Sequence, residues 1–179
     1  MGITTGILLF DDFEELDAIG PWEVFSVAKT LSPEDRVVMI AATREPVRAA
    51  KGLRVLPDHS FADAPPLDVV LVPGGQGTRR EVSNGLLIEW LRKAGAQCKW
   101  VTSVCTGAHV LWAAGLAPRK RATTHWTFIE TLRSCTDMTV LEAVIRSNPG
   151  LWLLKDGVVK GKWPYTNIPD ATEVTDLLQ

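Results

Sequence analysis

Short apolar runs alternate with segments of helical periodicity through roughly the first 140 residues. Aliphatic and β-branched runs predict strands, and apolar positions spaced by three and four residues predict helices between them. The expected strands are 6–10, 36–41, 69–72 and 99–104, and the expected helices are 21–28, 84–96 and 106–115. Because strands buried on both faces read as nearly continuous apolar runs, this alternation predicts a parallel sheet covered by helices.

Turn and capping residues set the expected ends of these elements. Pro21 is placed at the first position of its helix, where a missing N–H costs nothing. Ser83 or Asn84 is expected to cap the helix that follows, and Gly115 to end the helix before it. Residues 52–56 are expected to make a small β excursion.

The character of the chain changes after about Ser134. A short strand at 121–124 and a short helix at 125–132 precede this point, and two apolar runs within 150–163 flank the pair Asp156 and Gly157. An Asp-Gly pair between apolar runs is a strong signal for a β-hairpin. The parallel body is therefore expected to end in an antiparallel hairpin.

Composition narrows the class of protein. The chain has 179 residues, of which 46% are apolar and 22% charged, so it is expected to fold as one globular domain with an appendage. A net charge of −2 and a basic cluster of only three residues, 119–121, speak against nucleic-acid binding. No apolar run approaches the ~18 residues that cross a membrane, and the run 7–10 lacks the basic residues of a signal peptide.

Three cysteines without a close CxxC pair favour reduced thiols and a cytoplasmic location. No set of His, Cys and Asp has the spacing of a metal site, so none is expected. Cys98 and Cys135 are interpreted as structural or exposed residues that take no part in the chemistry.

Cys105 is the strongest candidate for chemistry. It stands between a predicted strand and a predicted helix, with small residues two positions before and after it, Ser103 and Gly107. That pattern is typical of a nucleophile elbow, a sharp turn that exposes the side chain at a helix N-terminus, where backbone amides favour a thiolate. The alternative is a small buried hydrophobic residue.

Asp17 is the candidate partner. It precedes the helix after the first strand, so it is expected at the same carboxyl edge of the sheet as Cys105. A carboxyl group near a thiolate has its pKa raised by the like charge and can exchange a proton. The alternative is a helix N-cap or a solvated acid.

Further residues are expected to shape the pocket. Gly74 and Gly75 end a neighbouring strand, and their amides could form an oxyanion pocket, with Thr106 adding its hydroxyl and amide. His125 is interpreted as a histidine that hydrogen-bonds near the site, and His109 as a core or surface residue of its helix. Neither spacing reveals a distance from the sulfur.

Five segments taken together resemble the DJ-1/PfpI superfamily, and its isocyanide hydratase branch most closely. They are LDAIGPWEVF at 16–25, LDVVLVPGG at 67–75, VTSVCTGA at 101–108, AGL at 114–116 and RATTHW at 121–126. The resemblance covers residues 1–142. It implies a flavodoxin-like three-layer sandwich, a homodimer with its active site near the interface, a small-molecule substrate and no cofactor.

Carried onto this chain, the resemblance makes Cys105 the nucleophile that attacks the terminal carbon of an isocyanide. Asp17 becomes the acid and base of the reaction, and Thr106 a residue that shapes the site. Much of the superfamily has Glu in the acid role and His directly after the cysteine. Asp17 and Thr106 therefore favour the hydratase branch.

Other readings stay open. Glyoxalase or deglycase chemistry would use the same thiolate, and the same segments occur in sensor domains of AraC-type regulators. Residues 143–179 depart from the superfamily and resemble the end of a thioredoxin-like domain, with 147–150 in the place of its proline turn. They are expected to pack on the domain formed by 1–142, and an inactive chimera is the third alternative.

Overall fold

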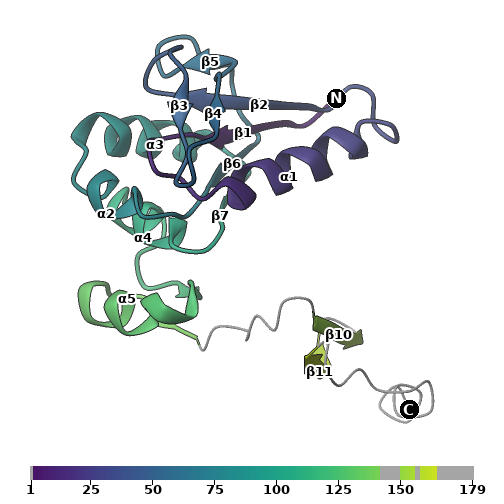
Figure 1. Ribbon diagram of the computed structural model, residues 1–179, viewed down its shortest axis with the longest axis vertical. Coiled ribbons are helices and arrows are strands. Elements are labelled where there is room, and N and C mark those ends of the chain that lie inside the picture. The colour runs from purple at the N-terminus through teal and green to yellow at the C-terminus, as the bar shows by residue number, and fades with distance from the viewer. Residues whose placement is uncertain (1, 142–149, 156–157, 165–179) are drawn as a thin grey trace. The chain divides into compact units, whose positions relative to one another are not determined.

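The computed structural model of the protein describes residues 2–141, 150–155 and 158–164. In this part of the chain, the central sheet has five parallel strands in the order β5-β2-β1-β6-β7 (Figure 1). Its strands are β1 (Thr4–Leu8), β2 (Arg36–Ala41), β5 (His59–Ser60), β6 (Val69–Val72) and β7 (Trp100–Ser103). The predicted parallel sheet is confirmed, and the predicted bounds 36–41 and 69–72 match β2 and β6.

The core follows from the apolar runs that form these strands. All four residues of β6 are buried, and so are the last four of β1. Ile7 of β1 and Val70 of β6 join Ile40 of β2 and Leu91 of α3 in one apolar cluster, and none of these four residues has exposed surface. A strand buried on both faces needs cover on both, which explains the layered arrangement.

Helices flank the sheet as in a flavodoxin-like sandwich (Figure 1). They are α1 (Glu15–Ala28), α2 (Thr78–Glu81), α3 (Gly85–Gln97) and α4 (Gly107–Ala113). α1 packs along β1 and β2, whereas α3 and α4 pack on β6. The side chain of Asn84 accepts the N–H of Leu87, so Asn84 is the N-cap of α3.

The prediction that Pro21 opens the first helix is wrong. α1 begins at Glu15, and Pro21 lies inside it. Acidic residues in the first turn, Glu15 and Asp17, favour this earlier start because they complement the positive end of the helix dipole. Pro21 removes only one intrahelical hydrogen bond, and the remaining turns support the helix on both sides of it.

Smaller elements complete the first unit. β3 (Val47–Arg48) pairs antiparallel with β4 (Arg54–Val55), so the expected excursion at 52–56 is half of a hairpin. β8 (Arg121–Ala122) pairs parallel with β9 (Thr139–Val140), and a 3-10 turn, Trp126–Phe128, leads into α5 (Ile129–Cys135). A second apolar cluster joins these elements to α4 through Ala108, Phe128, Ile129, Leu132, Met138 and Val140.

The predicted antiparallel hairpin is present at the C-terminal side. β10 (Gly150–Lys155) pairs with β11 (Val158–Pro164). The expected Asp156-Gly157 turn and residues 147–149 of the thioredoxin-like segment 147–150 lie outside the described residues, while Gly150 begins β10. The chain divides into two compact units, Met1–Ala143 and Val144–Gln179; packing of the second on the first stays a prediction. Among the described residues, no helix has the length and apolar character needed to cross a membrane.

Candidate active site

Cys105 occupies the turn between β7 and α4, as the sequence pattern predicts. Its backbone has φ of +53°, in the left-handed region that costs a residue with a side chain about 1 kcal/mol. Gly107 makes the turn possible, because a Cβ there would lie 2.2 Å from the Val72 carbonyl oxygen. The small residue two positions after Cys105 is thus explained by close packing against β6.

Thr124 holds this turn from the other side. Its side chain is buried, and its hydroxyl donates to the Cys105 carbonyl oxygen over 3.0 Å. Thr124 follows β8, so this hydrogen bond connects the segment after β8 to the turn that carries Cys105. The sequence assigned Thr124 no role at the site.

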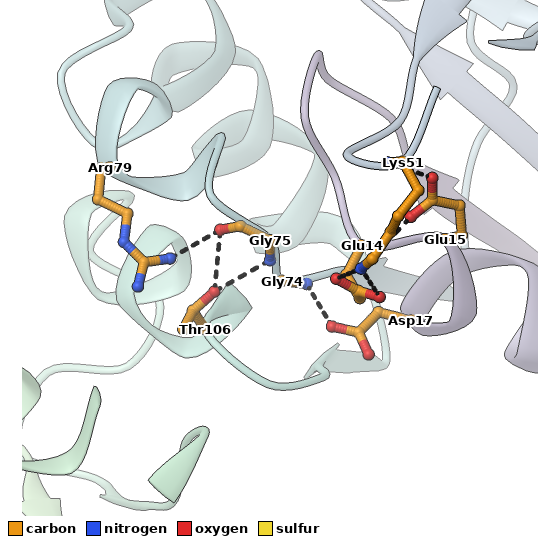
Figure 2. A network of polar contacts seen from close by, with 8 residues as sticks. All are labelled: Glu14, Glu15, Asp17, Lys51, Gly74, Gly75, Arg79 and Thr106. Carbon is orange, nitrogen blue, oxygen red and sulfur yellow. Dashed lines mark hydrogen bonds and ion pairs between the residues drawn. The ribbon is translucent and has the colours of Figure 1, made fainter. Parts of the chain in front are cut away.

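Asp17 lies in the first turn of α1, not before the helix as expected. The residue at the N-cap position is Glu14, so the N-cap alternative for Asp17 is wrong as well. The Asp17 side chain is only 2% exposed, which excludes a solvated acid. Its Oδ2 accepts the backbone N–H of Gly74 over 3.1 Å, and this bond ties α1 to the loop after β6 (Figure 2).

Gly74 brings Asp17 and Cys105 together. A Cβ on Gly74 would lie 2.7 Å from the Cβ of Cys105, 2.7 Å from the amide nitrogen of Thr106 and 2.8 Å from Oδ2 of Asp17. Both side chains therefore face the same small space beside one α-carbon. Only a residue without a side chain permits this approach.

Gly75 and Thr106 form the next contact of the network in Figure 2. The Gly75 N–H donates to Oγ1 of Thr106 over 3.1 Å, and the Thr106 hydroxyl lies 3.3 Å from the Gly75 carbonyl oxygen. Thr106 is buried, and the hydroxyl of Thr78 lies 3.1 Å from its own. Because the two glycine amides bind Asp17 and Thr106, they position these residues; a role as oxyanion donors stays a prediction.

A small cavity of about 140 Å³ lies beside Cys105. It is lined by Glu14, Gly75, Gln76, Arg79, Cys105, Thr106, His125 and Thr127. His125 caps the 3-10 turn, and its Nδ1 lies 2.8 Å from Oγ1 of Thr127. Four of the six predicted site residues thus line this cavity, and the other two, Asp17 and Gly74, lie next to Cys105.

Four of the lining residues were missed by sequence reasoning: Glu14, Gln76, Arg79 and Thr127. Glu14 and Gln76 are in loops next to predicted site residues, which is the one signal that could have found them. Arg79 and Thr127 reach the cavity through the fold of α2 and the 3-10 turn. Thr127 lies two residues after the predicted site residue His125, so the same signal applies to it, whereas Arg79 lies four residues after Gly75 and has no such signal.

Lys51 provides a positive charge behind Asp17. Its ammonium group forms hydrogen bonds to the Glu14 carboxylate and lies 3.7 Å from Oε2 of Glu15 (Figure 2). The hydrogen bond that Lys51 donates to Glu14 raises the pKa of Lys51, and the charges of Glu14, Glu15 and Asp17 add to this effect. Lys51 therefore stays protonated and balances the acidic first turn of α1.

His109 follows Cys105 by one helical turn but does not line the cavity. Its ring packs against Phe128 at 5.5 Å and Trp112 at 6.1 Å between centroids. Burial lowers the pKa of His109, and the charge of Arg79 lowers it further. Nε2 of His109 lies 3.4 Å from Sγ of Cys135, so this histidine contacts the exposed thiol of Cys135.

No group of three or more His, Cys, Asp or Glu side chains in the described part of the chain is arranged to hold a metal ion. The fold and the site define an α/β protein of flavodoxin-like architecture with a cysteine at a strand-to-helix elbow. The model of the DJ-1/PfpI family matches residues 5–162. The chain belongs to the DJ-1/PfpI family.

Individual relatives agree with this assignment. Isonitrile hydratase from Pseudomonas putida is 38% identical over 82% of this chain and 62% of its own length. Deglycase PYRAB04690 from Pyrococcus abyssi is 28% identical over 91% of this chain and 89% of its own. The crystal structure of a THiJ/PfpI family protein from Pseudomonas syringae superposes with a TM-score of 0.68 at 26% identity, over 82% of this chain and 58% of that one. The chain thus spans less than two thirds of the hydratase and of the Pseudomonas syringae protein.

Proposed function

We propose that the protein is a cysteine-dependent hydratase that converts isocyanides to N-substituted formamides. The observation that carries the proposal is the approach of Asp17 and Cys105 to the same α-carbon, that of Gly74. A nucleophile and a buried carboxyl group beside one another are the two groups this reaction needs. The similarity to isonitrile hydratase supports the choice of substrate.

In the proposed first step, Sγ of Cys105 forms a bond to the terminal carbon of R–N≡C. The same carbon receives a proton from the Asp17 carboxyl group, which gives the thioimidate R–N=CH–S. The Asp17 carboxylate then takes a proton from water, whose oxygen adds to the carbon, and passes that proton to the nitrogen to give R–NH–CH(OH)–S. The C–S bond breaks as the hydroxyl proton goes to Asp17, so the products are R–NH–CHO, the regenerated thiolate and the protonated Asp17 carboxyl group.

The elbow supports the role of Cys105 as the nucleophile. A side chain on a left-handed turn at the start of a helix is lifted out of the sheet and meets backbone amides that favour the thiolate. Thr106 and His125 line the same cavity and would contact the substrate. Water, substrate and protein supply every atom of the reaction, so the proposal includes no cofactor.

Glyoxalase or deglycase chemistry is the second candidate. The similarity to the Pyrococcus abyssi deglycase supports it, and so do the polar side chains among the lining residues, which could bind the oxygens of a small α-oxoaldehyde. Cys105 would then add to the aldehyde carbon to give a hemithioacetal. A sensor domain or an inactive chimera would keep the reactive thiol without turnover.

The test follows isocyanide loss and N-formyl product with the purified protein. Cys105→Ala removes the nucleophile, and Asp17→Asn keeps an oxygen for the Gly74 amide while it removes the titrating carboxyl group. We expect both variants to lose turnover, and Cys135→Ser, a change of an exposed thiol outside the cavity, to retain it. Conversion of methylglyoxal but not of isocyanides by folded protein would favour glyoxalase or deglycase chemistry. Turnover of neither substrate by folded protein would favour a sensor domain or an inactive chimera.

A homodimer in the cytoplasm forms part of the proposal. Sedimentation equilibrium of the purified protein tests the assembly. A monomer that is fully active would show that the site does not depend on a partner chain.

A further inference from the structure

Arg79 is a charged residue of the Cys105 cavity that the proposed reaction does not use. It comes from α2 and lines the cavity together with Cys105. Nη1 donates to the Gly75 carbonyl oxygen over 2.8 Å and lies 3.2 Å from Oγ1 of Thr78. The guanidinium carbon lies 4.5 Å from the centroid of the Phe128 ring.

These contacts fix the guanidinium group from two sides. Two acceptors hold Nη1, and the aromatic face of Phe128 supports the plane of the group, which is a favourable cation–π arrangement. Figure 2 shows the side chain extended toward Gly75, the residue that also binds Thr106. An arginine held in this way presents its remaining N–H groups without first paying the entropy of ordering a free side chain.

The charge of Arg79 has no partner of opposite sign among the described residues. The ion pairs of residues 2–141 include Lys51 with Glu14 and Glu15, and Arg80 with Asp12 and Glu81, but none with Arg79. Glu14 is the one carboxylate in the cavity lining, and Lys51 neutralises it. The cavity therefore carries a positive charge at its Arg79 side.

We propose that Arg79 binds an anionic group of the substrate, a carboxylate, and that this site selects small carboxylate-bearing electrophiles. Cys105 and Arg79 line the same cavity, so one small molecule can contact both side chains. The fork of guanidinium N–H groups matches the two oxygens of a carboxylate. Within the proposed hydratase function, on which this part rests, the substrate is a short isocyanide that carries a carboxylate.

The first experiment does not depend on turnover. Iodoacetate and iodoacetamide have nearly the same size and the same reactive carbon, but only iodoacetate carries a carboxylate. In both cases Sγ of Cys105 forms a bond to the CH2 carbon, the C–I bond breaks, and iodide leaves. The rate of Cys105 alkylation by each reagent is measured by mass spectrometry of the Cys105 peptide.

The ratio of the two rates reports the recognition of the charge. We expect Arg79→Gln to lower the iodoacetate to iodoacetamide ratio about threefold to fivefold, as for an exposed ion pair. Arg79→Lys, which keeps the charge, should retain most of the ratio. Arg36→Gln is the matched control, since Arg36 is exposed and begins β2. It therefore lies at the amino ends of the parallel strands, whereas Cys105 follows the carboxyl end of β7. The same ratio in Arg79→Gln and the wild type would overturn the proposal.

The second experiment compares kcat/KM for isocyanoacetate and the neutral 2-isocyanoacetamide. We expect the wild type to prefer the carboxylate and Arg79→Gln to lose this preference while it still hydrates the amide. Hydration of both compounds with no effect of Arg79→Gln on their ratio would overturn the substrate class and leave the hydratase function standing. Hydration of neither compound would contradict the hydratase function, and the alkylation ratio alone would then decide whether Arg79 binds anions.

Discussion

Asp17 and Cys105 both face the point where a side chain on Gly74 would begin. The distances from that point are 2.8 Å to Oδ2 of Asp17 and 2.7 Å to Cβ of Cys105. The two residues are far apart in the sequence and come from α1 and the β7–α4 turn, so the loop after β6 is what joins them. The chemistry proposed for the protein therefore depends on a residue that has no side chain.

Gly74→Ala tests this dependence. The added methyl group would meet three neighbours at less than 3 Å, and two of the contacts are with a Cβ and a backbone nitrogen that cannot rotate away. We expect the free energy of unfolding to fall by about 1–3 kcal/mol, the usual cost of overpacking. Alkylation of Cys105 and isocyanide turnover should both fall at least tenfold, as Asp17 and Cys105 are pushed apart.

Gly85→Ala is the matched control. Gly85 is the first residue of α3, and a Cβ there would have no heavy atom within 4 Å. Because alanine favours a helix more than glycine does, this variant should be as stable as the wild type or slightly more stable. Equal stability and activity of the two alanine variants in urea titrations and thiol assays would show that the space beside Gly74 is not critical.

Thr106→Val removes a hydroxyl group with little change in shape. The Gly75 N–H would lose its acceptor, and the Thr78 hydroxyl would lose one neighbour, in a buried part of the site. A buried donor without a partner costs about 1–3 kcal/mol, so the midpoint of urea unfolding should fall accordingly. Thr106→Ser keeps the hydroxyl and should restore most of the loss; a serine variant as unstable as the valine variant would contradict the role of these hydrogen bonds.

The left-handed backbone of Cys105 predicts an unusual order of stability. Glycine adopts φ of +53° without the steric cost that a Cβ carries, so Cys105→Gly should be more stable than Cys105→Ala by about 1 kcal/mol. At an ordinary helical position the order is the reverse. Ala96→Gly, on the exposed side of α3, should lose about 0.5–1 kcal/mol in the same unfolding experiment. A glycine variant of Cys105 less stable than its alanine variant would show that the turn is not strained.

The sequence predicted the fold well because the strongest signals are local. The apolar runs of β2 and β6 have the right length for buried strands, and Asn84 has the residue type that caps a helix. Pro21 misled because its most common helical position is the first one, while the acidic residues before it also favour a helix start. The short strands β5 and β9 were missed, since a strand of two residues has no periodicity to detect.

The residues of the candidate site also fall into two groups, those with a local sequence signal and those without one. Cys105, Gly74 and Gly75 were found because an elbow and a glycine pair at strand ends are local patterns. Arg79 was not, because it lies within α2 without a local pattern of its own, and its contact with Phe128 joins residues that are distant in the sequence. Residues that are brought together by tertiary packing alone leave no mark on a single sequence.

His109 predicts a pH dependence of stability. Burial among apolar rings lowers the pKa of His109 below 6.5, and the Arg79 charge lowers it further. As pH falls through the ordinary histidine value, the unfolded chain takes up a proton that the folded protein does not, so the unfolded state is favoured. The contribution of His109 is therefore fully present above about pH 6.5 and is lost as pH falls toward the lower pKa of the folded state.

The measurement is urea unfolding of the wild type and His109→Gln at several values between about pH 7.5 and 5.5. Glutamine does not titrate, so the stability of His109→Gln should fall less across this range than that of the wild type. His125→Gln is the matched control, because it removes another histidine and leaves His109 in place. Its free energy of unfolding should fall on acidification as much as that of the wild type. If His109→Gln and the wild type lose equal stability on acidification, the buried ring of His109 is not the group responsible.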